Sequence, residues 1–227
     1  MGTHDISLLS VVSAVGLLAA GCYDVHGVDP GPYVLDDFED GNFEPADPNF
    51  SQWVGATFSP DSNPSERDLD AGFGDSKHAL RLTFTIVDKA NGVQQDGAAA
   101  LETFATKPVD FARFDELDFK VSLASGDPPL SNDARLHVDL ACKTAPAEDG
   151  SVPGDFYVTR GATYDVNWQS KEFKLVTFGV PVGNKPIQGG LAGCLARVNS
   201  IRFTVNADIP DGQTGRGVLH IDDVKLQ

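Results

Sequence analysis

Short runs in which apolar and polar residues alternate recur along the chain and predict β-strands. The clearest run is Ala79–Val87, whose even-numbered residues are all leucine, phenylalanine or isoleucine. Because successive side chains of a strand point to opposite faces, such a run has one apolar face. Comparable runs lie at Trp53–Ser59, Gly97–Phe104, Phe114–Ala124, Ala134–Cys142, Phe156–Asp165, Phe173–Val182, Val198–Asn206 and Gly217–Leu226. About ten strands with one short helix around Leu191–Arg197 predict an all-β domain, a jelly-roll β-sandwich, over residues 33–227.

The first and last runs interrupt the apolar pattern with acids. On the even positions of the last run, one predicted face carries Val218, His220, Asp222, Val224 and Leu226. In the first run, the residues that share a predicted face are Val34, Asp36 and Phe38. A buried carboxylate is costly unless it is paired. We therefore expect the two ends of the domain to meet and their acids to hold a metal, for which calcium fits best. In the alternative, the acids are solvated or lie at a β-bulge.

Composition narrows the class of protein. The chain has 227 residues, of which 41% are hydrophobic, with 23 Gly, 14 Pro and a formal net charge of −16. One domain of this size can bury a sizeable core. The negative charge argues against nucleic acid as a partner, because phosphate binding needs clustered Lys and Arg. It suits an exported protein that stays soluble by self-repulsion.

The N-terminal segment resembles a targeting sequence for export. An apolar run, Ile6–Ala20, is followed by Gly21 and Cys22, and it is shorter than the roughly 20 residues that a membrane span needs. Small residues directly before a cysteine resemble a bacterial lipobox, in which Cys22 is lipidated and becomes the mature N-terminus. This predicts a lipoprotein signal peptide over residues 1–22 and a tether over residues 23–32. Met1–Asp5 contains no Lys or Arg, which departs from the signal-peptide pattern, so a plain signal peptide or a buried apolar strand is the alternative.

If Cys22 is lipidated, the protein is anchored to a membrane. The residue after Cys22 is Tyr23 and not Asp. By the sorting rule known for enteric lipoproteins, this predicts that the protein is located at the outer membrane or cell surface. Two cysteines then remain, Cys142 and Cys194. In an oxidising compartment such a pair favours a disulfide, with two buried free thiols as the alternative. Neither has a His or a second Cys at zinc-ligand spacing.

Several phrases, taken in order, resemble one family. They are L-D-D-F-E-D-G-N from Leu35, G-F-G-D-S-K-H-A-L-R-L from Gly72, V-D-F-A-R-F-D-E-L-D-F-K-V from Val109, F-K-L-V-T-F-G-V-P from Phe173, V-N-S-I-R-F-T-V from Val198 and G-V-L-H-I-D-D-V-K-L from Gly217. Together they resemble the galactose-binding-like jelly rolls, especially carbohydrate-binding modules of the family 11 type. The resemblance implies a two-sheet sandwich with adjacent terminal strands and a structural calcium near them. Its implied calcium ligands are Asp36, Asp37, Glu39, Asp222 and Asp223.

The resemblance implies a carbohydrate partner. Sugars stack on aromatic faces and hydrogen-bond to polar side chains. The candidate ligand-binding residues are Trp53, Tyr157, Arg160, Tyr164, Asp165 and Trp168, although aromatic rings in a sandwich often belong to its core. No G-x-S-x-G, H-E-x-x-H, P-loop or Rossmann pattern is present, so we expect no enzymatic activity. The alternative is a structural or protein-interaction lipoprotein that keeps the scaffold and binds a protein partner at the cell surface.

Overall fold

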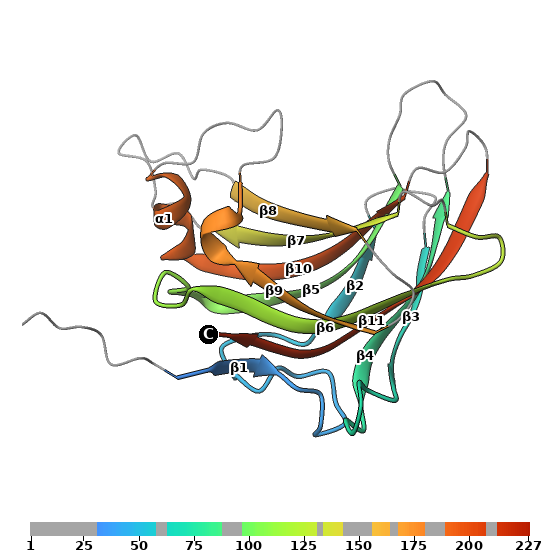
Figure 1. Ribbon diagram of the computed structural model, residues 1–227, viewed down its shortest axis with the longest axis horizontal. Helices are drawn as coiled ribbons and strands as arrows, with labels where there is room; N and C mark the ends of the chain where they lie inside the picture. Colours follow the sequence, from blue (N-terminus) through green and yellow to red (C-terminus); the bar gives the residue numbers. More distant parts are fainter. Residues whose placement is uncertain are drawn as a thin grey trace, which may run out of the picture.

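Two antiparallel sheets pack face to face in the computed structural model (Figure 1). The structure describes residues 31–57, 63–87, 97–130, 134–142, 156–163, 168–179, 189–207 and 213–227. One sheet contains, in order, β3 (Asn63–Asp70), β4 (Ala79–Val87), β11 (Thr214–Leu226), β6 (Glu116–Ser125) and β9 (Gln169–Lys174), with β1 (Tyr33–Asp36) paired to β11. The other contains β2 (Val54–Thr57), β5 (Gly97–Val109), β10 (Val198–Ala207), β7 (Arg135–Cys142) and β8 (Phe156–Thr163). This confirms the prediction of an all-β sandwich of about ten strands.

The core lies between the two sheets and follows the alternation in the sequence. The even-numbered residues of β4 are fully buried, and so are Ile201, Phe203 and Val205 of β10. Trp53 joins the two layers, since its ring centroid lies 6.0 Å from that of Phe38 and 5.9 Å from that of Phe203. Each large apolar side chain buried in this way contributes about 1.5–3 kcal/mol.

The two ends of the domain meet, as the sequence predicts. β1 pairs antiparallel with the last part of β11, with Tyr33 opposite Leu226 (Figure 1). β11 also pairs with β4 on one side and with β6 on the other, so the final strand runs through the middle of its sheet.

A β-bulge interrupts β11 and corrects one prediction. The register to β6 shifts between Asp222 and Lys225, and Asp223 has a φ of 52°. Before the bulge Leu219 and Ile221 face the core, whereas after it Val224 and Leu226 do. The prediction that all even positions share one face is therefore wrong, because the extra residue moves the core face to the other parity. β1 shows the same effect: its register shifts between Val34 and Asp36, and Val34 is 40% exposed.

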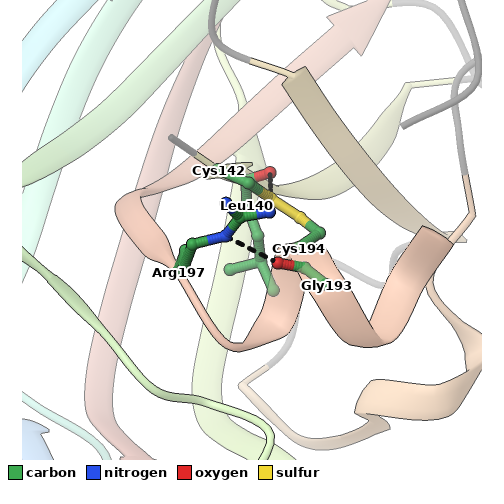
Figure 2. The surroundings of a disulfide bond; sticks show 5 residues. All are labelled: Leu140, Cys142, Gly193, Cys194 and Arg197. Carbon is green, nitrogen blue, oxygen red and sulfur yellow. Dashed lines mark hydrogen bonds between the residues drawn. A yellow bond between two sulfur atoms is a disulfide. The ribbon is translucent and has the colours of Figure 1, made fainter. Parts of the chain in front are cut away.

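A disulfide joins Cys142 at the end of β7 to Cys194 in the short helix α1 (Gly190–Leu195) (Figure 2). This confirms the predicted bridge and the predicted helix. Beside it, Arg197 Nε donates to the Gly193 carbonyl at 3.2 Å, which secures the C-terminal side of the helix. A cross-link between residues 52 positions apart stabilises a fold by about 4 kcal/mol in the chain-entropy account.

The 3₁₀ helix η1 (Leu175–Thr177) follows β9 and buries Leu175 against the core. Among the described residues, no helix has the length and apolar character needed to cross a bilayer. The predicted signal peptide, Cys22 and residues 23–30 of the predicted tether lie outside the described residues.

Candidate functional site

Asp36 is a buried structural acid. Its side chain accepts a hydrogen bond from the Phe38 backbone N–H at Oδ1 (2.8 Å) and from Trp53 Nε1 at Oδ2 (2.8 Å). Only 2% of Asp36 is exposed, and this burial raises the pKa of its carboxyl to about 7, against the lowering effect of the two hydrogen bonds. Both oxygens have donors from the protein, so Asp36 positions Trp53 between the sheets.

Trp53 is a core residue. Its ring is fully buried, so it offers no face to a sugar, and its predicted stacking role is wrong. Trp53 directly precedes the short strand β2, and its indole lies between the sheets. There the indole N–H donates a hydrogen bond to Asp36. The sequence does not show this, because an indole suits either a binding face or a core.

The other four predicted calcium ligands lie together. A pocket of about 220 Å³, here called the acidic pocket, is lined by Asp37, Glu39, Phe73, Ser76, Lys120, Asp222 and Asp223. Four stretches of chain form it: the segment after β1, the connection between β3 and β4, strand β6 with Lys120, and the bulge of β11. The bulge places adjacent acids of β11 at the same pocket, although regular alternation would separate them.

Hydrogen bonds hold the walls of the acidic pocket. Asp222 Oδ2 accepts from the Phe73 backbone N–H (3.0 Å), and Glu39 Oε1 accepts from Ser76 Oγ (2.7 Å) and from the Lys77 backbone N–H (2.9 Å). Burial raises the pKa of the Asp222 carboxyl, whereas the hydrogen bond from Ser76 lowers that of Glu39. A Cβ at Gly72 would lie 2.7 Å from Asp222 Oδ2, so glycine permits the close approach of this loop.

Calcium is not confirmed by this arrangement. Within the described ranges, no group of three or more His, Cys, Asp or Glu is placed to hold a metal ion. Calcium needs six to eight oxygens converging at 2.3–2.6 Å, and the ammonium group of Lys120 lines the same pocket. The calcium site therefore stays a prediction.

Beside the acidic pocket lies a group of rings, here called the aromatic platform, made of Phe73, Trp168 and His220. Phe73 is 39% exposed and meets Trp168 edge to face, with 5.9 Å between ring centroids. Trp168 lies 5.7 Å from the ring of His220. Trp168 was predicted from the sequence, but Phe73 was missed. The sequence does contain a sign that Phe73 is exposed: it lies between two glycines in a polar loop, where an aromatic ring has few core neighbours.

Charged groups surround the aromatic platform. Lys120 Nζ lies 5.6 Å from the Phe73 ring centroid and donates to Ser170 Oγ at 2.9 Å. His220 Nε2 lies 3.4 Å from Asp70 Oδ2, while burial lowers the pKa of this imidazole. At neutral pH His220 is therefore a neutral neighbour of Trp168.

The outer face of the five-stranded sheet carries a second set of polar groups, here called the polar row: Glu102, Asp139, Ser200, Arg202 and Thr204. In register, Arg202 lies between Glu102 on β5 and Asp139 on β7. Asp139 Oδ2 accepts from Arg202 Nε (3.0 Å) and from Thr204 Oγ1 (2.8 Å). Ser200 Oγ donates to Glu102 Oε1 at 2.5 Å. The sequence alone does not indicate this row, because each member is a lone polar residue in an alternating strand.

The predicted sugar-binding residues that fall within the described ranges lie at different places in the fold. Trp53 is in the core, and Trp168 directly precedes β9, a strand of the six-stranded sheet, whereas β8 belongs to the five-stranded sheet. Arg160 lies on β8 with its guanidinium carbon 5.8 Å from the Phe173 ring centroid. The backbone of Tyr157 pairs with Ala141 of β7. Tyr164 and Asp165 lie outside the described residues.

Comparison with solved structures identifies the class of fold. A family 11 carbohydrate-binding module from Clostridium thermocellum, solved in complex with a β-1,3-1,4-mixed-linked tetrasaccharide, matches with a TM-score of 0.55 at 17% identity, over 86% of this chain and 94% of that one. The family 11 module of the cellulosomal cellulase Lic26A-Cel5E of the same organism matches with a TM-score of 0.51 at 17% identity, with the same coverage. No protein-family model and no curated protein matches the chain. The fold is thus the jelly roll of family 11 carbohydrate-binding modules, which confirms the resemblance at the level of fold.

Asp36 should make stability depend on pH. Its pKa is raised in the folded state, so between about pH 4 and pH 7 the unfolded chain has lost a proton that the native one keeps, and stability falls as the pH rises. The full shift corresponds to about 4 kcal/mol. We expect the difference in unfolding free energy between wild type and Asp36→Asn to change by this order between pH 4 and pH 8 in urea titrations. Exposed Asp110 serves as the control through Asp110→Asn. Parallel curves for wild type and Asp36→Asn would contradict the raised pKa.

The calcium prediction is tested by thermal unfolding. An ion that binds only the native state raises the melting temperature. If the acids of the pocket bind calcium, millimolar calcium should raise Tm by several degrees relative to a chelator, and Asp222→Asn should abolish the rise. Asp68→Asn, at an exposed residue of β3, is the matched control. An unchanged Tm rejects the metal site.

Proposed function

We propose that this chain is a non-catalytic glycan-binding module, and that the glycan lies across the polar row on the outer face of the five-stranded sheet. The observation that carries the proposal is a row of polar side chains on the outer face of a sheet that is held in place by hydrogen bonds between its members. The side chains of Arg202 and Asp139 are 15% and 11% exposed, whereas Ser200 is 1% exposed and supports its neighbours. Polar groups that are already oriented lose little side-chain entropy when they bind a ligand.

The geometry of the polar row suits hydroxyl-rich ligands. Arg202 presents a planar array of donors, while Glu102 and Asp139 on either side provide acceptors. A sugar hydroxyl both donates and accepts, so it can bond to both kinds of group. With two acids and one arginine the row is slightly negative, which favours neutral glycans over acidic ones.

Apolar surface lies next to the polar row. Phe104 is 45% exposed and pairs in register with Ser200, and Val54 is 38% exposed and pairs with Glu102. An exposed ring beside hydrogen-bonding groups is the combination that sugar sites use. The family 11 neighbour that was solved with a mixed-linked tetrasaccharide has the same fold, which supports a β-glucan as the first ligand to try and supports a non-enzymatic role.

We propose further that the module is carried by an exported lipoprotein anchored through Cys22. The disulfide between Cys142 and Cys194 supports export, because such bonds persist in oxidising compartments. The small residues before Cys22 support lipidation, and Tyr23 after it supports the outer membrane or cell surface.

Phe104 should contribute to glycan affinity and little to stability. We expect Phe104→Ala to weaken binding of mixed-linkage β-1,3-1,4-glucan about five- to tenfold, because a stacked ring contributes on the order of 1 kcal/mol beyond its buried area. Affinity electrophoresis measures this, with Val176→Ala as control, since Val176 is 75% exposed and lies on η1, outside the polar row. If neither this glucan nor a neutral mannan or xylan retards the wild type, the glycan proposal fails and the protein-interaction alternative replaces it.

Cys22 should carry the anchor. Mass spectrometry of the membrane-extracted protein from a bacterial host should show a chain that starts at Cys22 with attached acyl groups. Cys22→Ser should appear in the soluble exported fraction or remain unprocessed. An exported protein with unmodified Cys22 would refute the anchor without affecting the glycan proposal.

A further inference from the structure

We propose that His137 is a further ligand-contacting residue of the glycan site, and that it makes glycan binding depend on pH. The inference rests on the proposed function of the polar row and adds one residue and one form of regulation to it. His137 lies on β7, two residues before Asp139. Leu136 and Val138 on either side of it are fully buried in the core, so its imidazole projects from the same outer face as the polar row.

The ring of His137 is neither sealed inside the sheet nor fully solvated. The residue is half-buried. In register, Thr204 of β10 lies opposite it on one side and Gly161 of β8 lies opposite it on the other. Because glycine has no side chain, the paired position of β8 adds no group beside the imidazole. Part of the ring is therefore open to a ligand on this face.

The ring nitrogens of His137 have no hydrogen-bond partner in the part of the chain that the structure describes, and neither is a polar atom sealed from solvent. The hydroxyl group opposite is bonded elsewhere, since Thr204 Oγ1 donates to Asp139 Oδ2 at 2.8 Å. A neutral imidazole has one donor nitrogen and one acceptor nitrogen. It therefore suits a sugar hydroxyl, which also donates and accepts.

His137 lies within reach of a ligand on the polar row. Residues two apart in a strand are separated by about 6.6–6.8 Å along the strand. Asp139 and the guanidinium of Arg202, which bonds to it at 3.0 Å, are thus near neighbours of the imidazole. An oligosaccharide that bonds to this pair extends beyond a single sugar ring, so it also covers part of the imidazole.

The charges near His137 nearly balance. Arg135 and Asp139 flank it on β7, while Arg202 and Glu102 lie at the register positions of Asp139 on β10 and β5. Two cations and two carboxylates therefore lie near the ring. The residues of β8 that pair with the three β7 positions do not titrate in the range of histidine: Thr159, Gly161 and Thr163.

Burial decides the charge of the imidazole. It lowers the pKa of His137, against the raising effect of Asp139 and together with the lowering effect of Arg135. The ring is therefore neutral at neutral pH. A glycan that covers the ring removes it further from water and lowers this pKa again, because a desolvated imidazole disfavours its charged form.

The sign of the pH dependence follows from linkage. A ligand that lowers the pKa of a base binds the neutral form more tightly, so affinity is full above the pKa of the free protein and falls as the pH drops through it. Protonation also removes the acceptor nitrogen of His137 and adds a third cation beside Arg135 and Arg202. The imidazolium then attracts the Asp139 carboxylate and competes with the bonds that hold it in the polar row.

The pH profile of binding tests the proposal. Isothermal titration calorimetry measures the Kd of the protein, with its disulfide intact, for a soluble mixed-linkage β-1,3-1,4-gluco-oligosaccharide between pH 7.5 and pH 5, or for a mannan or xylan oligosaccharide if that one binds instead. We expect the Kd of the wild type to rise at least about threefold over this range, within the limit of about tenfold per pH unit for one proton.

Two variants assign the effect. His137→Gln keeps a donor and an acceptor but does not titrate, so it should bind within about threefold of the wild type at pH 7.5 and lose the pH dependence. His220→Gln is the matched control, because His220 is also half-buried but lies on the six-stranded sheet. It should keep the wild-type profile.

NMR of the imidazole signals gives a second measurement. Linkage is reciprocal, so a saturating concentration of the oligosaccharide should lower the pKa of His137 and leave that of His220 unchanged. The spectrum of His137→Gln identifies the signal.

Three results would overturn the role of His137 and leave the glycan site intact. They are a wild-type Kd that is constant between pH 7.5 and pH 5, a pH dependence that persists in His137→Gln, and an imidazole pKa that the ligand does not lower. A wild type that binds none of the three oligosaccharides at pH 7.5 would instead overturn the proposed function together with this inference.

Discussion

The break in alternation at Asp222 and Asp223 is the constraint on which both the closure of the sandwich and the acidic pocket depend. Before it, β11 contributes Leu219 and Ile221 to the core, and after it Val224 and Leu226. Without the extra residue, either the final apolar pair or the earlier one would point to solvent. The bulge thus lets one long strand serve as the centre of a sheet and as the partner of β1. It also leaves two carboxylates at a loop junction, where they line the acidic pocket.

The buried pair of Asp36 and Trp53 complements this closure. β1 is short and lies at the end of its sheet, and its carboxylate reaches the indole that packs between the two layers. An aspartate in this position is costly to desolvate, which is why its pKa is raised, yet it satisfies two buried donors. The terminal acids therefore have different roles: Asp36 organises the core, while Asp37 and Glu39 line the acidic pocket.

The two outer faces of the sandwich carry different groups. On the five-stranded sheet, the polar row is extended and pairs arginine with carboxylates across neighbouring strands. On the six-stranded sheet, the site is compact and combines one exposed ring with several acids and a lysine. One sandwich can present such different faces, because the residues of each face vary independently of the fold.

The sequence by itself determined most of the strands, the class of fold, the meeting of the terminal strands and the cysteine pair, but it did not predict β3, which lies in a polar stretch without alternation. These depend on the period of apolar residues and on cysteine count, which are local or compositional signals. Only the tertiary structure decided which residues share a site. The sequence does not distinguish Trp53 from Trp168, because an indole suits both a core and a surface. In the structure Trp53 lies in the core, whereas Trp168 lies beside the partly exposed Phe73. Phe73, Lys120 and Arg202 gain their roles from strands distant in sequence, and a bulge of one residue reverses the faces of β11. Such positions depend on packing between sheets, which no local pattern encodes.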